Sequence, residues 1–191
     1  MSVGLFIVLA LVVTLALYVV LIYNNLVRLK HNVSQAWSNI DVLLKQRHDE
    51  LPKLVETCKQ YMKHEREVLE KVTQARAEVG KAREAGNVDA LGVAETHLRA
   101  GLMSLFAVAE NYPELKANEN FQHLQNRISQ LEAQIADRRE YYNDTVNANN
   151  VRIEQFPDAV IAQSFGFGPR HLLTFAEAEL KDVNVGDLFK S

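Results

Sequence analysis

The chain has 191 residues, enough for one membrane segment and one modest domain. Its 21 basic and 24 acidic residues give a formal net charge of −3, which argues against a nucleic-acid-binding protein, since such proteins carry a basic excess. The single cysteine, Cys58, excludes an intrachain disulfide and a cysteine-based zinc site.

The first element is an uncharged apolar run from Val3 to Tyr23. At 1.5 Å per residue it spans roughly 32 Å, close to the ~30 Å hydrocarbon core of a bilayer. A cleavable signal peptide is disfavoured because no Lys or Arg precedes the run, the run is long, and no small-x-small cleavage site follows it. We therefore predict an anchor over residues 1–23. Its lipid-contacting residues include Val3, Leu5, Leu11, Leu17 and Tyr23.

Flanking charge predicts the orientation of this anchor. Arg28, Lys30, Lys45 and Arg47 all follow the run, and no basic residue precedes it. The positive-inside rule then places the short N-terminus outside and the C-terminal domain in the cytoplasm.

A helical pattern follows the anchor. Apolar or small residues recur every three or four positions from Trp37 to Val79, which predicts one long helix of the coiled-coil type. Arg47 and Glu65 are polar interruptions of this seam. Pro52 lies within it, but the seam stays in phase across the proline, which favours a kink over a break.

Two further helices are predicted downstream. Gly86 and Asn87 provide a stop and a new start for a helix that ends before Pro113. Asn118 begins a third helix, which closes at Phe156–Pro157. Arg139 and Asn149 interrupt the seam of this helix and either fix its register or face water.

These patterns predict an all-α protein. One N-terminal transmembrane helix precedes an antiparallel, coiled-coil-like bundle of three to four helices over residues 24–157, followed by a partly ordered tail over residues 158–191. Within the tail we expect one or two helical turns at Asp158–Gln163, a break at Gly166–Pro169 and an amphipathic stretch at Leu172–Leu180.

The predicted first helix is much longer than the second, so part of its seam lacks an obvious cover. We consider three covers for it: the tail folding back, a sharp bend at Pro52 that adds a fourth helix, or another protein chain. Our hypothesis is that the proximal seam mediates oligomerisation or partner docking. Its residues are Val33, Trp37, Ile40, Leu44 and Leu51.

No motif for catalysis or metal binding is complete. His64-Glu65 begins the pattern H-E-x-x-H, but Val68 stands where the second histidine is needed. No histidine follows a glutamate by three residues, so the Glu-x-x-His motif of di-iron bundles is missing. Cys58 lies on the apolar seam, where a thiol behaves as a small hydrophobe. We predict no catalytic, cofactor or metal site.

Three stretches resemble the LemA family in order and spacing. They are YNNLVRLKHNVSQAWSNIDVLLKQRHDELPKLVETCKQYMKHE, VAENYPELKANENFQHLQ and RREYYNDTVNANNVRIEQFPDAVIAQSFGF, from Tyr23 to Phe167. The family often has tyrosine where this chain has Asn149, and usually an aromatic pair in the tail. The resemblance implies a bacterial protein with an N-terminal transmembrane helix and a cytoplasmic bundle of long helices. It implies no molecular mechanism.

The function expected from the sequence is a non-enzymatic, membrane-anchored scaffold that binds partner proteins through helical seams. One alternative is a self-assembling protein that organises or shapes the membrane. Another is an enzyme with an unrecognised site, which a cluster of His64, Glu65 and a third ligand would favour. The expected partners are membrane lipid through the N-terminal helix and the protein itself or another membrane-associated protein, without nucleic acid. The expected location is the bacterial cytoplasmic (inner) membrane.

Overall fold

The computed structural model describes residues 3–175, and this part of the chain is helical with no strand, as the sequence predicts. It divides into two compact units. Unit 1 holds residues 3–40 and 138–172, and unit 2 holds residues 41–137 and 173–175. The predicted amphipathic stretch at Leu172–Leu180 lies mostly outside the described residues.

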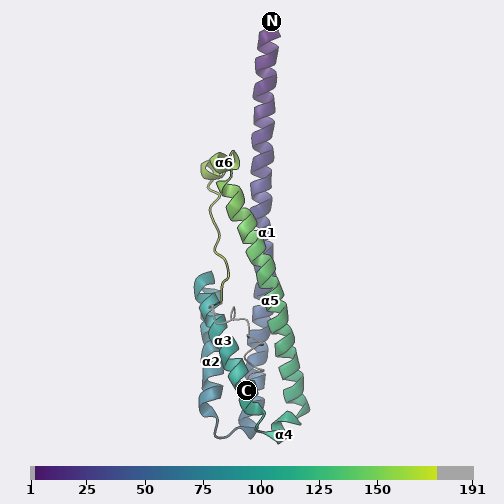
Figure 1. The fold of residues 1–191 in the computed structure, drawn as a ribbon, viewed down its shortest axis with the longest axis vertical. Helices are drawn as coiled ribbons and strands as arrows, with labels where there is room; N and C mark the ends of the chain where they lie inside the picture. Colours follow the sequence, from purple (N-terminus) through teal and green to yellow (C-terminus); the bar gives the residue numbers. More distant parts are fainter. Residues whose placement is uncertain (1–2, 176–191) are drawn as a thin grey trace, which may run out of the picture. The chain divides into compact units, whose positions relative to one another are not determined.

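Unit 2 is a bundle of four long helical segments (Figure 1). Its elements are the C-terminal part of α1 (Val3–Tyr61), α2 (Arg66–Glu84), α3 (Val88–Ala109), the short α4 (Pro113–Lys116) and the N-terminal part of α5 (Glu119–Glu154). Apolar side chains spaced by three or four residues on each segment fill the core, among them Leu44, Leu54, Val72, Val79, Leu98, Leu105, Ile128 and Leu131.

The prediction of one helix from Trp37 to Val79 is wrong. α1 ends at Tyr61, and the chain turns through residues 62–65 before α2 begins. The fourth helix that the sequence left open therefore exists, but the turn is not at Pro52, through which α1 continues. Met62 is 1% exposed at this turn, so the reversal is itself packed into the core.

The predicted helix caps in unit 2 are confirmed. The Asn87 side chain accepts a hydrogen bond from the Ala90 amide (3.0 Å), and the Asn118 side chain accepts one from the Phe121 amide (3.0 Å). Gly86 precedes the first cap with φ of 63°, in the left-handed region that glycine adopts without strain.

An arginine compensates for the proline inside α1. Pro52 has no N–H, so it cannot donate to the carbonyl of His48 one turn earlier. Arg76 of α2 donates its Nε–H to that carbonyl instead, at 2.9 Å. The helix thus continues because a neighbouring helix supplies the missing donor.

We expect Arg76→Leu to lower the free energy of unfolding by about 1 kcal/mol, because the His48 carbonyl loses a donor. In a Pro52→Ala background the loss should shrink, since an alanine at this position restores the intrahelical N–H. Urea unfolding of the four variants, analysed as a double-mutant cycle, measures this coupling. Equal losses in both backgrounds would show that Arg76 does not compensate for the proline.

Unit 1 contains the N-terminal part of α1, the C-terminal part of α5 and α6 (Asp158–Phe165). The expected turns after Pro157 form α6, which ends at Gly166 in the left-handed conformation (φ 71°). An apolar cluster joins α6 to both long helices and consists of Ile22, Leu26, Ile153, Ile161, Ala162 and Phe167.

The end of the described chain packs on unit 2 through residues 173–175. A Cβ built on Gly92 of α3 would lie 2.0 Å from the carbonyl oxygen of Thr174. Only glycine allows this close approach, and the adjacent Leu173 is 1% exposed. Residues 173 and 174 of the predicted tail are therefore packed against α3.

Candidate functional site

The burial pattern of α1 changes at Ile22. Residues 3–18 are exposed around the whole helix, whereas from Ile22 onward buried residues recur every three or four positions. The apolar part has a mean hydropathy of 3.2 over 18 residues, so α1 is long and apolar enough to cross a membrane. The predicted anchor residues are all exposed: Val3 (76%), Leu5 (49%), Leu11 (65%), Leu17 (61%) and Tyr23 (38%).

The residues predicted as an assembly surface are covered within their own units. Val33 and Ile40 are buried in unit 1, while Leu44 and Leu51 are buried in unit 2. The partly buried Trp37 packs against Tyr142 of α5, with ring centroids 5.5 Å apart. The seam is therefore covered within its own chain, by the predicted third helix (α5) and by the hairpin of α1 and α2, whose turn was not predicted at residues 62–65. Its role in assembly stays a prediction.

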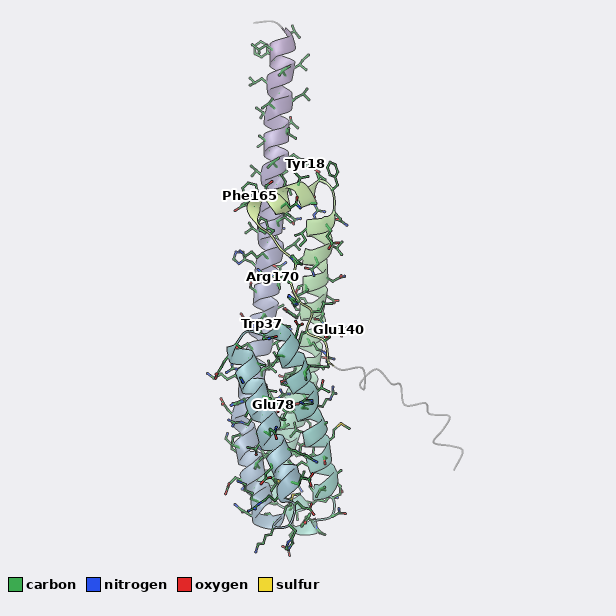
Figure 2. The ribbon with its side chains drawn as sticks, turned by 90° about the vertical axis from the view of Figure 1, so that its left-hand side faces the viewer. Tyr18, Trp37, Glu78, Glu140, Phe165 and Arg170 are labelled. Carbon is green, nitrogen blue, oxygen red and sulfur yellow. The ribbon has the colours of Figure 1, made fainter. Side chains whose placement is uncertain are left out.

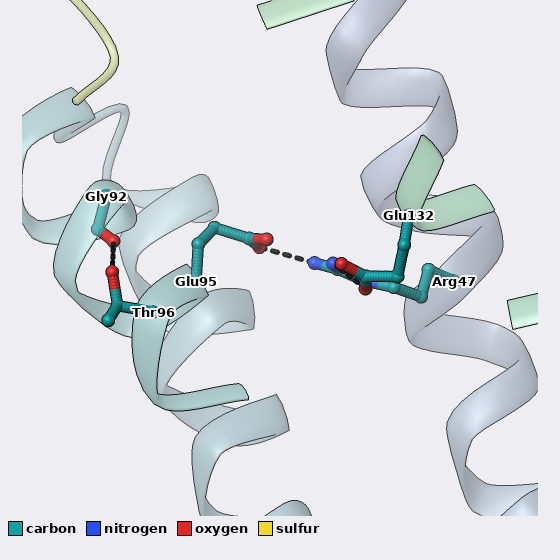
Figure 3. A network of polar contacts seen from close by, with 5 residues as sticks. All are labelled: Arg47, Gly92, Glu95, Thr96 and Glu132. Carbon is teal, nitrogen blue, oxygen red and sulfur yellow. Dashed lines mark hydrogen bonds and ion pairs between the residues drawn. The ribbon is translucent and has the colours of Figure 1, made fainter. Parts of the chain in front are cut away.

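The most unusual polar group in unit 2 is a buried ion triad (Figure 3). Arg47 of α1 donates from one terminal nitrogen to Glu95 of α3 and from the other to Glu132 of α5, each at 2.5 Å. Arg47 is 1% exposed and Glu95 3% exposed, whereas Glu132 is 23% exposed. Three helices therefore meet through one guanidinium.

The electrostatics of the triad favour the charged arginine. Burial opposes the charge, but the carboxylates of Glu95 and Glu132 outweigh it and raise the pKa of Arg47 above its ordinary value. The Arg47 Nε has no hydrogen-bond partner within the described part of the chain. Because both terminal nitrogens are engaged and Arg47 and Glu95 are shielded from water, the arrangement is that of a structural contact between helices rather than an acid–base pair.

The sequence carried a partial signal for this triad. Arg47 falls on the seam of α1, three residues after Leu44 and four before Leu51, so its position predicts an inward side chain. Glu95 and Glu132 gave no comparable signal, because each is one of many glutamates on helices. Their pairing depends on the turn at residues 62–65, which places α3 beside α1.

Two clefts lie beside that same turn. One, of about 700 Å³, has Met62 and Leu69 among its apolar lining and three basic side chains in its wall, Lys59, Lys63 and Arg66. The other, of about 640 Å³, is lined by Lys63, His64, Tyr112 and Glu114 among others. The wall of the larger cleft also contains Glu70, which pairs with Arg66 at 3.8 Å, and the apolar floor is largely buried, with Met62 1% and Leu69 5% exposed.

Within the described residues, the third ligand that the enzyme alternative requires beside His64 and Glu65 is not found. Glu65 accepts a hydrogen bond from the Tyr112 hydroxyl (3.2 Å), and residues 3–175 bring together no group of three His, Cys, Asp or Glu side chains able to hold a metal. Burial raises the pKa of the Cys58 thiol to about 12, so this cysteine is not a thiolate at neutral pH. Within these residues, His64 and Glu65 therefore gain no third ligand.

Packing also shifts the pKa of His48. Burial and the nearby Arg76 lower its pKa from the ordinary value, and the ring lies 3.2 Å from the position that a Cβ on Gly80 would take. In the unfolded chain the pKa returns to about 6.5, so below that pH the unfolded state binds the proton more readily.

We therefore expect the free energy of unfolding to fall as the pH drops below about 6.5, until the folded pKa is passed and the loss levels off. His48→Gln should make the curve flatter across this window. Urea unfolding at several pH values for both proteins measures the difference. Identical slopes would show that His48 does not contribute.

Polar side chains of α5 hold the extended residues 166–172 in unit 1. Asn150 forms two hydrogen bonds with the backbone of Arg170, accepting from its amide (2.8 Å) and donating to its carbonyl (2.9 Å). The Tyr142 hydroxyl donates to the carbonyl of His171 (2.9 Å). Asn149, the polar interruption predicted from sequence, is 3% exposed and donates to the Asn150 side chain (3.2 Å), so it supports this arrangement rather than facing water.

We expect Asn150→Ala to release residues 166–172, because two hydrogen bonds worth together about 1–3 kcal/mol are lost. Amide hydrogen exchange of Arg170 should accelerate accordingly. Asn147→Ala, on an exposed position of the same helix, is the matched control and should leave exchange unchanged. Unaltered exchange in Asn150→Ala would contradict the assigned role.

Comparison with known proteins identifies the family of this chain. A sequence profile of the LemA family matches residues 36–186. The chain belongs to the LemA family. This LemA-family chain is 26% identical over 169 residues to Protein LemA of Metamycoplasma hominis, covering 86% of this chain and 74% of that protein.

Two further relatives carry a different name. The chain is 24% identical over 168 residues to Magnetosome protein MamQ 1 and to Magnetosome protein MamQ 2 of Paramagnetospirillum magneticum, covering 76% of this chain. It spans 62% of the length of each. The names of the family and of these relatives denote no enzymatic activity.

Proposed function

We propose that this LemA-family protein is a non-enzymatic scaffold anchored in a membrane by residues 3–21 of α1. The observation that carries the proposal is the change of burial at Ile22. A helix that is apolar around its whole circumference is costly in water and is favoured in lipid. From Ile22 onward α1 has one buried face, as a helix packed within a folded protein does.

The proposed location is the bacterial cytoplasmic membrane, with a short N-terminus outside and the chain that follows the apolar run in the cytoplasm. The basic residues Arg28 and Lys30, both exposed, follow the apolar run and support this orientation. A single-pass anchor with no Asp, Glu, Lys, Arg or His in its apolar run supplies attachment and no ion pathway.

The proposed docking site is the larger cleft beside the turn at residues 62–65. Lys59 and Lys63 favour carboxylates at the edge of the cleft, and Met62 and Leu69 offer a small apolar surface at its floor. The partner that fits is a protein segment that combines apolar residues with acidic ones. The buried triad supports this use, because it holds α1 and α3 in fixed register within the same bundle.

Photo-cross-linking in intact membranes tests the scaffold. A photoreactive residue at Lys63 should capture one defined second protein, whereas the same residue at the exposed Gln130 of α5 should not. Lys63→Glu in combination with a probe at Lys59 should reduce the yield. Capture at neither position, with the chain recovered in the membrane fraction, would contradict a partner at this cleft.

Self-assembly that organises the membrane is the alternative function. The observation behind this alternative is the similarity of the chain to two proteins named for the magnetosome. Cross-links formed only between copies of this chain would favour it over a scaffold for a different protein.

A further inference from the structure

The corner between α5 and α6 exposes large apolar side chains, and its one exposed charged residue is Glu154 at the end of α5. Phe156 is 87% exposed, Val160 54% and Phe165 59%. From residue 155 to residue 169 the only ionisable side chain is Asp158. It is 2% exposed and accepts a hydrogen bond from Arg152 Nε at 2.6 Å, so its charge is compensated inside the fold.

This corner is fixed to α1 at the end of the apolar run. Ala162 of α6 packs in one cluster with Ile22 and Leu26. The rings of Phe165 and Phe167 meet the ring of Tyr23 edge-on, with centroid distances of 4.9 Å and 5.7 Å. Figure 2 shows Phe165 beside α1, slightly lower in the view than Tyr18 of that helix.

The length of the apolar run, residues 3–21, indicates how deep in a bilayer the contact between α6 and α1 lies. Residues 3–21 span roughly 28 Å as a helix, close to the ~30 Å of bilayer hydrocarbon. If this stretch spans the bilayer, Tyr23 and α6 lie where hydrocarbon gives way to headgroups. That layer accommodates aromatic rings and neutral polar groups, which is the composition of the exposed face of α6.

We propose that the corner carrying Phe156, Val160 and Phe165 inserts into the membrane interface beside the anchor. α6 is then a second, peripheral lipid contact, which orients unit 1 against the bilayer surface. This inference rests on the proposed anchoring by α1. The lipid surface is favoured over a protein partner because the patch is continuous with the apolar run and lacks free charge.

Tryptophan fluorescence in vesicles of brominated phosphatidylcholine tests the inference on the full chain. The natural tryptophan, Trp37, is replaced by phenylalanine, and single tryptophans are introduced as Phe156→Trp or Val160→Trp. Leu11→Trp reports the anchor. Tyr141→Trp is the matched control, because Tyr141 is 51% exposed and its neighbour Tyr142 packs on Trp37, roughly 21 Å along α1 beyond Tyr23.

We expect Phe156→Trp and Val160→Trp to lose fluorescence mainly to bromines near the headgroup. Leu11→Trp should lose it mainly to bromines deep in the acyl chain, and Tyr141→Trp should keep it. Quenching of Leu11→Trp without quenching at either corner position would overturn the inference and leave the anchor intact. Burial of the corner in a second protein copy would give that same result. Absence of quenching at Leu11→Trp would overturn the anchor and the inference together.

Discussion

Replacement of Arg47 by leucine is expected to lower the free energy of unfolding by about 3–5 kcal/mol. The substitution removes the guanidinium that neutralises the Glu95 carboxylate, and Glu95 is 3% exposed. A carboxylate so placed must either stay charged without that cation or take up a proton, and both cost free energy. Glu132 loses less, since at 23% exposed it reaches water.

Urea unfolding of the full chain in detergent, followed by circular dichroism, measures this loss. Arg83→Leu is the control, because Arg83 also links two helices of unit 2 but pairs with Asp41 at the surface (3.2 Å). Its loss should stay below about 1 kcal/mol. The double variant Arg47→Leu/Glu95→Leu should regain much of the stability, because apolar side chains then replace the buried pair. A loss in Arg47→Leu no larger than in Arg83→Leu would contradict a buried, compensated triad.

The sequence predicted the starts of α3 and α5 because their signals are local. The caps at Asn87 and Asn118 need only a side chain and an amide three residues away. The apolar run up to Tyr23 depends on composition alone. These elements were correctly placed before any tertiary contact was known.

The hairpin of α1 and α2 was missed for a physical reason. Its turn at residues 62–65 contains neither glycine nor proline, and the apolar period of α1 continues in phase into α2. The same seam can therefore face one long partner helix or fold back on itself. The burial of Met62 and the hydrogen bond from Tyr112 to Glu65 are tertiary contacts of this turn, and no local sequence pattern predicts them.

Because the turn at residues 62–65 is not predicted from the sequence, the candidate site beside it is not predicted either. Without the turn, the seam of Leu44 and Leu51 looked uncovered and was assigned to assembly, whereas both residues are buried in unit 2. The clefts beside Lys63 exist only because the chain reverses there. Long-range pairing, such as that of Arg47 with Glu95, follows from the topology and not from either local sequence.

A charge in the middle of the anchor should have the second large effect. Leu11 lies near the centre of residues 3–21, where an arginine costs about 2.5–3.5 kcal/mol and a leucine contributes favourably. Leu11→Arg is therefore expected to shift the balance between inserted and uninserted chain by roughly 100-fold. The fraction of protein that stays with membranes after extraction at alkaline pH measures this shift.

Two matched variants test whether the effect of the added charge depends on its depth in the bilayer. Met103→Arg adds the same charge to a comparably exposed apolar residue of α3, 67% against 65% for Leu11, and should leave membrane retention unchanged. Val3→Arg lies at the end of the run, where a long basic side chain reaches the headgroups, so its effect should be smaller than that of Leu11→Arg. Equal retention of Leu11→Arg and the unaltered chain would show that residues 3–21 do not span the bilayer. A graded loss, largest at Leu11, requires that this helix crosses the hydrocarbon, since water or a protein surface imposes no such dependence on position.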